Sequence, residues 1–186
     1  MNMKLTKTLI TTAVLSTLSL SAFADPTVYG KVNVSVQNSD DGTETISELK
    51  SNASRLGVKG GYKLKNGLSV IYQYEFQVDV ADQSGSENLK SRNQYIGLKG
   101  NFGEVTLGRT DTVLKKSQAK VDLFSDLNGD IKKLWKGENR MSNSVGYKTP
   151  KFNNFQFGIS YILSEDSDQS DTATSFSGTY GDASLK

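Results

Sequence analysis

Residues 68–79 read LSVIYQYEFQVD, and their alternation decides the fold. The apolar and aromatic side chains fall on one face: Leu68, Val70, Tyr72, Tyr74, Phe76 and Val78. The polar side chains fall on the other face, and Ile71 alone breaks the pattern: Ser69, Gln73, Glu75, Gln77 and Asp79. A period of two residues is that of a β-strand, and about eleven such residues are the length that a tilted strand needs to cross a bilayer. The stretch therefore predicts a strand with one apolar and one polar face.

The same period recurs along the chain and predicts eight strands in all. They are expected at 27–37, 54–64, 68–79, 92–100, 104–109, 141–148, 154–163 and 174–180. The connections between them alternate in length: 65–67, 101–103, 149–153 and 181–182 are short, whereas 38–52, 80–91, 110–140 and 164–173 are long and polar. Short turns at one end and long loops at the other are typical of outer-membrane barrels. The sequence therefore favours an all-β fold, a transmembrane antiparallel β-barrel.

The N-terminal residues 1–24 predict a cleavable signal peptide. Lys4 and Lys7 form a basic start, residues 9–20 are apolar or hydroxylated, and the motif Ala22-Phe23-Ala24 suits a signal peptidase. The apolar part is too short to cross a bilayer as a helix. We therefore expect an exported chain that begins near Asp25.

The composition excludes several classes of function. The chain has 22 basic and 20 acidic residues. Because the predicted signal peptide holds Lys4 and Lys7 and no acid, the rest is neutral, and nucleic acid is not an expected partner. The chain contains neither Cys nor His, which removes disulfides, the usual zinc ligands and the usual nucleophile and base pairs. We expect no cofactor, no dedicated metal site and no enzymatic activity.

Alternation alone leaves other folds and functions open. An exported, soluble β-sandwich shows the same period, with one face of each sheet in its core. A surface barrel that binds a partner through its long loops, as an adhesin does, also fits the pattern. Lys31, Arg55 and Lys59 on the polar face suit a water-filled lumen, but a one-sided sheet tolerates them too.

Residues 120–140 carry three acids at intervals of four: Asp122, Asp126 and Asp130. Paired carboxylates can do acid–base work, but no nucleophile or orienting partner accompanies these. Residues 126–130 read DLNGD and begin like a calcium-binding EF-hand loop. The pattern then fails, because Ile131 stands at the position of the required Gly and Gly137 at that of the bidentate Glu. No calcium module is predicted.

Four motifs occur in order: TVYGKV (27–32), SRLGVKG (54–60), LKNGLSVIYQYE (64–75) and RNQYIGLKGNFGEVTLGR (92–109). Together they resemble the N-terminal half of Gram-negative general-diffusion porins, particularly the neisserial and vibrio-type branch, from Asp25 to the last residue. The resemblance implies a barrel of roughly 16 strands, of which this chain supplies the first eight. It also implies a homotrimer in outer-membrane lipid that lets ions and small hydrophilic solutes diffuse passively through a water-filled channel.

The resemblance further implies that the third long connection, 110–140, folds inward and narrows the pore. By motif, the acids of this constriction are Asp122, Asp126 and Asp130, and the basic residues of the facing wall are Lys31, Arg55, Arg92 and Arg140. Alternation independently places Lys31 and Arg55 on the polar face, and it places Arg140 with Ser144 and Lys148. It places Arg92 with Ile96 and Leu98 on the apolar face, so at this position the two predictions conflict.

The chain departs from the family in two respects. The constriction segment is unusually basic, which leaves the sign of any ion preference open; the lysines concerned, which also suit a solvated loop edge, are Lys115, Lys116, Lys120, Lys132, Lys133 and Lys136. The chain also stops after eight predicted strands without a terminal aromatic residue. Half a barrel has two open edges that a bilayer does not tolerate. The expectation is therefore a fragment or a truncated product.

Overall fold

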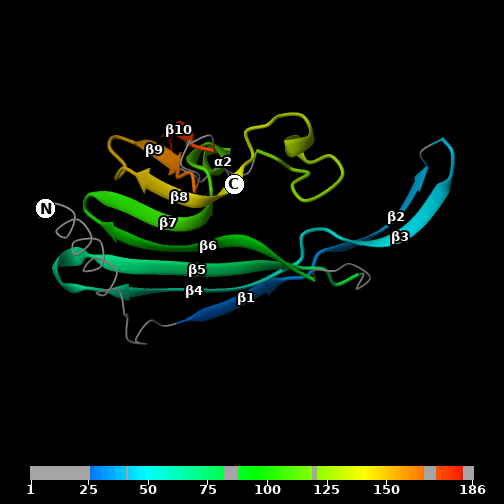
Figure 1. Cartoon of the computed structure of the whole chain (residues 1–186), viewed down its shortest axis with the longest axis horizontal. Helices are drawn as coiled ribbons and strands as arrows, with labels where there is room; N and C mark the ends of the chain where they lie inside the picture. The colour runs from blue at the N-terminus through cyan, green and yellow to red at the C-terminus, as the bar shows by residue number, and fades with distance from the viewer. Residues whose placement is uncertain (1–25, 41, 82–87, 119–120, 166–170, 182–186) are drawn as a thin grey trace, which may run out of the picture.

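The computed structural model describes residues 26–40, 42–81, 88–118, 121–165 and 171–181. Eight antiparallel strands form one sheet in the order β1-β4-β5-β6-β7-β8-β9-β10 (Figure 1). Their bounds are β1 Thr27–Lys31, β4 Arg55–Lys63, β5 Ser69–Val78, β6 Leu89–Gly100, β7 Gly103–Asp111, β8 Arg140–Lys148, β9 Phe155–Ile162 and β10 Ala173–Tyr180. The predicted all-β, antiparallel fold with eight barrel-type strands is confirmed. The predicted signal peptide and Lys120 lie outside the described residues.

One face of this sheet is apolar, and no other element of the described part of the chain covers it. The strand register places five large side chains side by side across β5 to β9: Tyr72, Ile96, Leu107, Val145 and Tyr161. Leu107 is 46% exposed and Tyr161 41% exposed. A sandwich would cover such a face with a second sheet, whereas a barrel wall presents it to lipid. The structure thus favours the barrel wall over the soluble sandwich.

A separate hairpin, β2 (Val34–Asp40) and β3 (Thr45–Ser51), extends beyond the end of β1 and β4 (Figure 1). The prediction of one strand over 27–37 and a loop over 38–52 was wrong here. The backbone N–H of Asn33 donates to Ser54 Oγ at 3.0 Å, and its carbonyl accepts from the N–H of Asn52 at 2.7 Å. Both backbone groups of Asn33 are thus bonded to Asn52 and Ser54, just before β4, and the first strand leaves the main sheet at this point.

A β-bulge resolves the conflict over Arg92. In the pairing of β5 with β6, Tyr74 lies opposite Gln94 and Phe76 opposite Ser91, so two residues of β6 face the single residue Glu75. The extra residue resets the alternation of β6. Arg92 consequently bonds to Glu75 on the polar face, and its placement with Ile96 by alternation was wrong.

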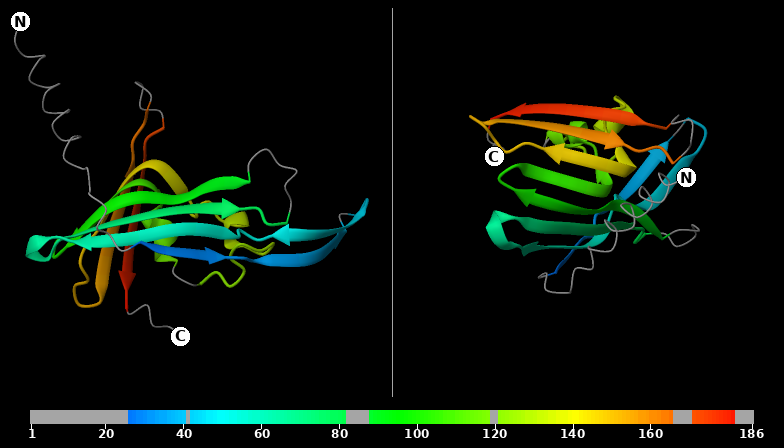
Figure 2. Two further views of the ribbon diagram at one scale, coloured as in Figure 1. Left: turned by 90° about the horizontal axis from the view of Figure 1, so that it is seen from below. Right: turned by 60° about the vertical axis from the view of Figure 1, so that its left-hand side comes forward.

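In the described residues between β7 and β8, the only regular structure is two short helical turns, α2 (Val113–Ser117) and η2 (Ile131–Lys133). Among the described residues, no helix is long and apolar enough to cross a membrane. Near its start the segment packs on β8, β9 and β10, and further along it reaches β1 and β4. The segment thus contacts strands near both edges of one strongly curved sheet, and it therefore runs across the concave, polar face (Figure 2).

Candidate functional site

The start of the β7–β8 segment is fixed to the wall by hydroxyl groups. The N–H of Val113 donates to Ser160 Oγ at 3.1 Å, and the N–H of Leu114 donates to Ser175 Oγ at 3.3 Å. Ser160 of β9 and Ser175 of β10 are directly paired, so they present adjacent acceptors. A β-carbon on Gly158 would lie 3.0 Å from Val113 Cγ1. The small residues of β9 and β10 therefore form a seat for α2.

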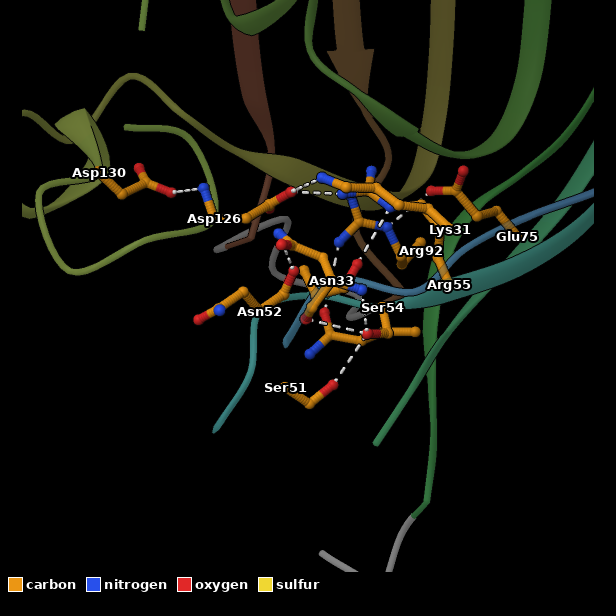
Figure 3. A network of polar contacts seen from close by, with 12 residues as sticks. Lys31, Asn33, Ser51, Asn52, Ser54, Arg55, Glu75, Arg92, Asp126 and Asp130 are labelled. Carbon is orange, nitrogen blue, oxygen red and sulfur yellow. Dashed lines mark hydrogen bonds and ion pairs between the residues drawn. The ribbon is translucent and has the colours of Figure 1, made fainter. Parts of the chain in front are cut away.

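The tip of the segment, residues 126–128, is held by ion pairs at the opposite edge of the sheet, on β1 and β4. Asp126 accepts a hydrogen bond from Arg55, and its carboxylate lies 3.7 Å from Lys31 Nζ (Figure 3). Lys31 and Arg55 are directly opposite each other on β1 and β4. The amide of Asn128 pairs with Gln37 and Lys50 of the hairpin, each at 3.3 Å. Of the three predicted acids, Asp126 is the one in contact with the predicted basic wall.

Asp122 and Asp130 are engaged within the segment itself. The carboxylate of Asp130, which is 3% exposed, accepts hydrogen bonds from the N–H groups of Asp126 and Lys132, each at 2.9 Å. Asp122 accepts from the N–H of Phe124 at 2.9 Å and of Ile131 at 3.3 Å. Burial alone would raise the pKa of Asp130, but the two backbone hydrogen bonds and the ammonium group of Lys132 together outweigh burial and hold that pKa below its usual range. Both acids shape the segment.

Arg92 and Glu75 form a second charged cluster on the wall. Arg92 Nε donates to Glu75 Oε1 at 2.6 Å, and the hydroxyl of Tyr29 donates to Glu75 Oε2 at 2.9 Å. Gln73 in turn donates to the Tyr29 hydroxyl at 2.7 Å. The sequence placed Glu75 on the polar face but gave it no role at the site. Its pairing depends on the bulge in β6, which no alternation count detects.

Arg140 and Asp111 form a third cluster where the segment leaves the sheet. Arg140 lies 3.0 Å from Asp111, and Asn93 Nδ2 donates to the same carboxylate at 2.9 Å. Lys115 bridges Asp111 at 3.4 Å and Glu138 at 3.7 Å. The sequence missed Asp111 because β7 extends two residues past its predicted end at residue 109. The opposite charge of Arg140, just before the next predicted strand, is the signal that could have identified Asp111.

Several charges of both signs thus meet along a single polar surface crossed by one segment. Four predicted basic residues line it, and each contacts a carboxylate: Lys31, Arg55, Arg92 and Arg140. Fixed, opposed charges beside low-dielectric walls create a field that orders water and acts on passing ions. An apolar exterior, a polar interior and an inward segment that carries charge to the wall define the wall of an outer-membrane β-barrel of the pore-forming class.

The chain belongs to the Gram-negative porin family, which it matches over residues 11–185. It is 32% identical over 160 residues to the major outer membrane protein P.IB of Neisseria sicca, an alignment that covers 79% of this chain and 44% of the relative. The corresponding protein of Neisseria meningitidis serogroup A is 32% identical over 168 residues, with 81% and 48% covered. The chain therefore spans about half the length of these relatives. Its location is the outer membrane.

Solved porins share the fold. The anion-selective porin from Comamonas acidovorans has a TM-score of 0.63 at 26% identity, covering 77% of this chain and 48% of that one. OmpT of Vibrio cholerae, in its trimer form, has a TM-score of 0.60 at 20% identity, covering 86% and 48%. At the latter identity the likeness concerns the fold alone.

Proposed function

We propose that this chain forms part of a water-filled channel through which ions and small hydrophilic solutes diffuse passively. Family membership supports the channel, and the apolar exterior supports contact with lipid. One observation carries the proposal: the segment from β7 to β8 crosses the polar face and brings Asp126 to Arg55 and Lys31. A loop that crosses a lumen in this way restricts it.

In this proposal residues 110–140 are the constriction, and their acids act in two ways. Asp126 faces the basic wall and contributes to the transverse field. Asp122 and Asp130, engaged by backbone N–H groups, keep the loop in the shape that presents Asp126. On the wall, Arg92 and Arg140 act together with Glu75 and Asp111, so part of their charge is compensated.

We also propose export by a signal peptide over residues 1–24 and assembly as a homotrimer. The large uncovered apolar side chains of the outer face suit both lipid and neighbouring copies. The trimer is tested on detergent-solubilised protein by native mass measurement before and after heating. A species with the mass of one chain before heating would contradict it.

The channel is tested with protein purified from outer membranes and added to a planar lipid bilayer. We expect stepwise increases in conductance that scale with the salt concentration, because a wide aqueous pore conducts in proportion to the ions available. Matched detergent without protein is the control. Absence of conductance from correctly inserted protein would refute the proposal and favour a plugged, adhesin-like surface barrel.

A further inference from the structure

Asn128, at the tip of the β7–β8 segment, is followed directly by Gly129. The N–H of Asp130 donates to the carbonyl of Leu127 at 3.1 Å, which closes a turn with Asn128 and Gly129 at its centre. Both central residues are exposed. The hydrogen bond of such a turn does not use the N–H of the third residue, and glycine has no β-carbon that would screen this nitrogen. The Gly129 nitrogen is therefore accessible beside the Asn128 side chain.

The side-chain amide of Asn128 is polarised by two residues of the β2–β3 hairpin. Lys50 Nζ donates to Asn128 Oδ1 at 3.3 Å, and Asn128 Nδ2 donates to Gln37 Oε1 at 3.3 Å. An ammonium group beside a carbonyl oxygen stabilises the negative charge that develops on that oxygen when a nucleophile adds to the carbon. The contact with Lys50 therefore activates Asn128 Cγ toward attack by the neighbouring backbone nitrogen.

We propose that Asn128 is a modification site at which the chain deamidates itself, assisted by Lys50. Hydroxide removes the proton of the Gly129 amide, and the nitrogen then forms a bond to Asn128 Cγ. The resulting negative charge lies on Oδ1, beside Lys50. The bond from Cγ to Nδ2 breaks, and Nδ2 takes a proton from water and leaves as ammonia. The product is a five-membered cyclic imide.

Water completes the reaction by opening this imide. It adds to one of the two imide carbonyl carbons, and the bond from that carbon to the imide nitrogen breaks. Opening on one side gives aspartate at position 128, and opening on the other side gives isoaspartate. Overall, one water is consumed and one ammonia is released, so the reaction needs neither an oxidant nor a metal.

A second Asn-Gly pair, Asn66 and Gly67, provides a comparison within the same chain. It lies in the short turn between β4 and β5, which is closed by a hydrogen bond from the N–H of Leu64 to the carbonyl of Leu68 at 2.8 Å. Asn66 has a φ of +62° and a ψ of +30°. At this ψ the Gly67 nitrogen is turned away from the Asn66 side chain, whereas the reaction requires the two atoms to approach closely. We therefore expect Asn66 to deamidate more slowly than Asn128.

Deamidation would change the charge of the loop tip. The new carboxylate at position 128 faces Lys50, so an ion pair replaces a neutral contact between the hairpin and the tip. A single negative charge about 8 Å from the ion path, screened over a Debye length of about 8 Å, raises the potassium-to-chloride permeability ratio about twofold. This effect on conduction rests on the proposed channel function, whereas the deamidation does not.

The modification is tested on protein purified from outer membranes and incubated in mildly alkaline buffer. Proteolysis and mass spectrometry then measure the fraction of acid at positions 128 and 66 over time. We expect faster conversion at Asn128 than at Asn66. Lys50→Gln should slow conversion at Asn128 about threefold, as expected for loss of one exposed charged contact, and leave Asn66 unchanged. Gly129→Ala, whose β-carbon would lie 3.2 Å from Phe124 Cγ, should slow it by screening the nitrogen.

The outcomes separate this inference from the proposed function. Conversion at Asn66 as fast as at Asn128, or an unchanged rate at Asn128 in Lys50→Gln, overturns the assisted site. Freshly purified Asn128→Asp isolates the effect on conduction, measured as the reversal potential in a potassium chloride gradient. An unchanged reversal potential in this conducting variant overturns the effect of the modification on the channel. No conductance from inserted wild-type protein refutes the channel itself and leaves the deamidation rates as the evidence on the site.

Discussion

Asp126→Asn is the substitution that most directly probes the constriction. It removes the charge of the loop tip but keeps the side chain's size. At the 3.7 Å that separates Lys31 Nζ from the carboxylate, the attraction is about 4 kcal/mol at an effective dielectric constant of about 20. Because the Lys31 side chain is 49% exposed, solvent screening reduces the net loss over both ion pairs to about 1–2 kcal/mol. Such a loss shifts the equilibrium between the state in which the loop tip is bound to Arg55 and Lys31 and the state in which it is released about tenfold toward release.

Single-channel recording at neutral pH measures both consequences of this change. The current should fluctuate more, since the tip leaves Arg55 more often, and the reversal potential in a salt gradient should move toward anions. Asn128→Ala is the control, because it removes the tip's hydrogen bonds to Lys50 and Gln37 without a change in charge. We expect it to increase the fluctuation and leave the reversal potential in place. An Asp126→Asn channel with wild-type noise and reversal potential would refute the docking of the tip by charge.

Three further changes test the loop and its wall. Ser160→Ala leaves a buried N–H at the start of α2 without its acceptor, which we expect to cost about 1–3 kcal/mol and to raise protease cleavage of the loop; unchanged cleavage would contradict the seat. Glu75→Gln uncovers the charge of Arg92 and should shift the reversal potential toward anions by an amount close to that of Asp126→Asn, whereas no shift would place Arg92 outside the ion path. Because the folded pKa of Asp130 lies below its ordinary value of 3.8, its stabilisation is complete above that value and is lost as the pH falls through the folded pKa. The fluorescence of Trp135, the single tryptophan, should stay constant down to about pH 4, and a transition at higher pH would count against this role.

The sheet could be predicted from the sequence because each strand carries its own alternation of apolar and polar residues. Residues 68–79 alternate whatever their neighbours do, and the tight turns between strands are readable from Asn and Gly. The hairpin β2–β3 was missed because its origin lies in a contact between Asn33 and Ser54, 21 positions apart in the chain. Its residues alternate well enough to extend the first strand, and only the distant hydroxyl reveals where that strand breaks.

The charged site was predictable in its members but less so in its pairings. Alternation alone correctly placed Lys31 and Arg55 on the polar face, because their strands are regular up to those positions. The equal spacing of Asp122, Asp126 and Asp130 gave no reason to distinguish them. The local backbone distinguishes them. Asp126 has a φ of +70°, whereas the carboxylates of Asp122 and Asp130 accept hydrogen bonds from backbone N–H groups of the segment. The partner of Arg92 depended on a bulge, which has no signature in hydropathy.

The two attachments of the β7–β8 segment have a mechanical meaning. The segment is seated on Ser160 and Ser175 at one end of the curved sheet and tied to Arg55 and Lys31 at the other. The segment therefore links two distant parts of the curved sheet, and such a link limits how far the sheet can flatten or curl more tightly. Lateral pressure from the bilayer acts on the convex, apolar face of that sheet. In the proposed channel, the residues of the constriction therefore also act as a strut that maintains the cross-section of the lumen.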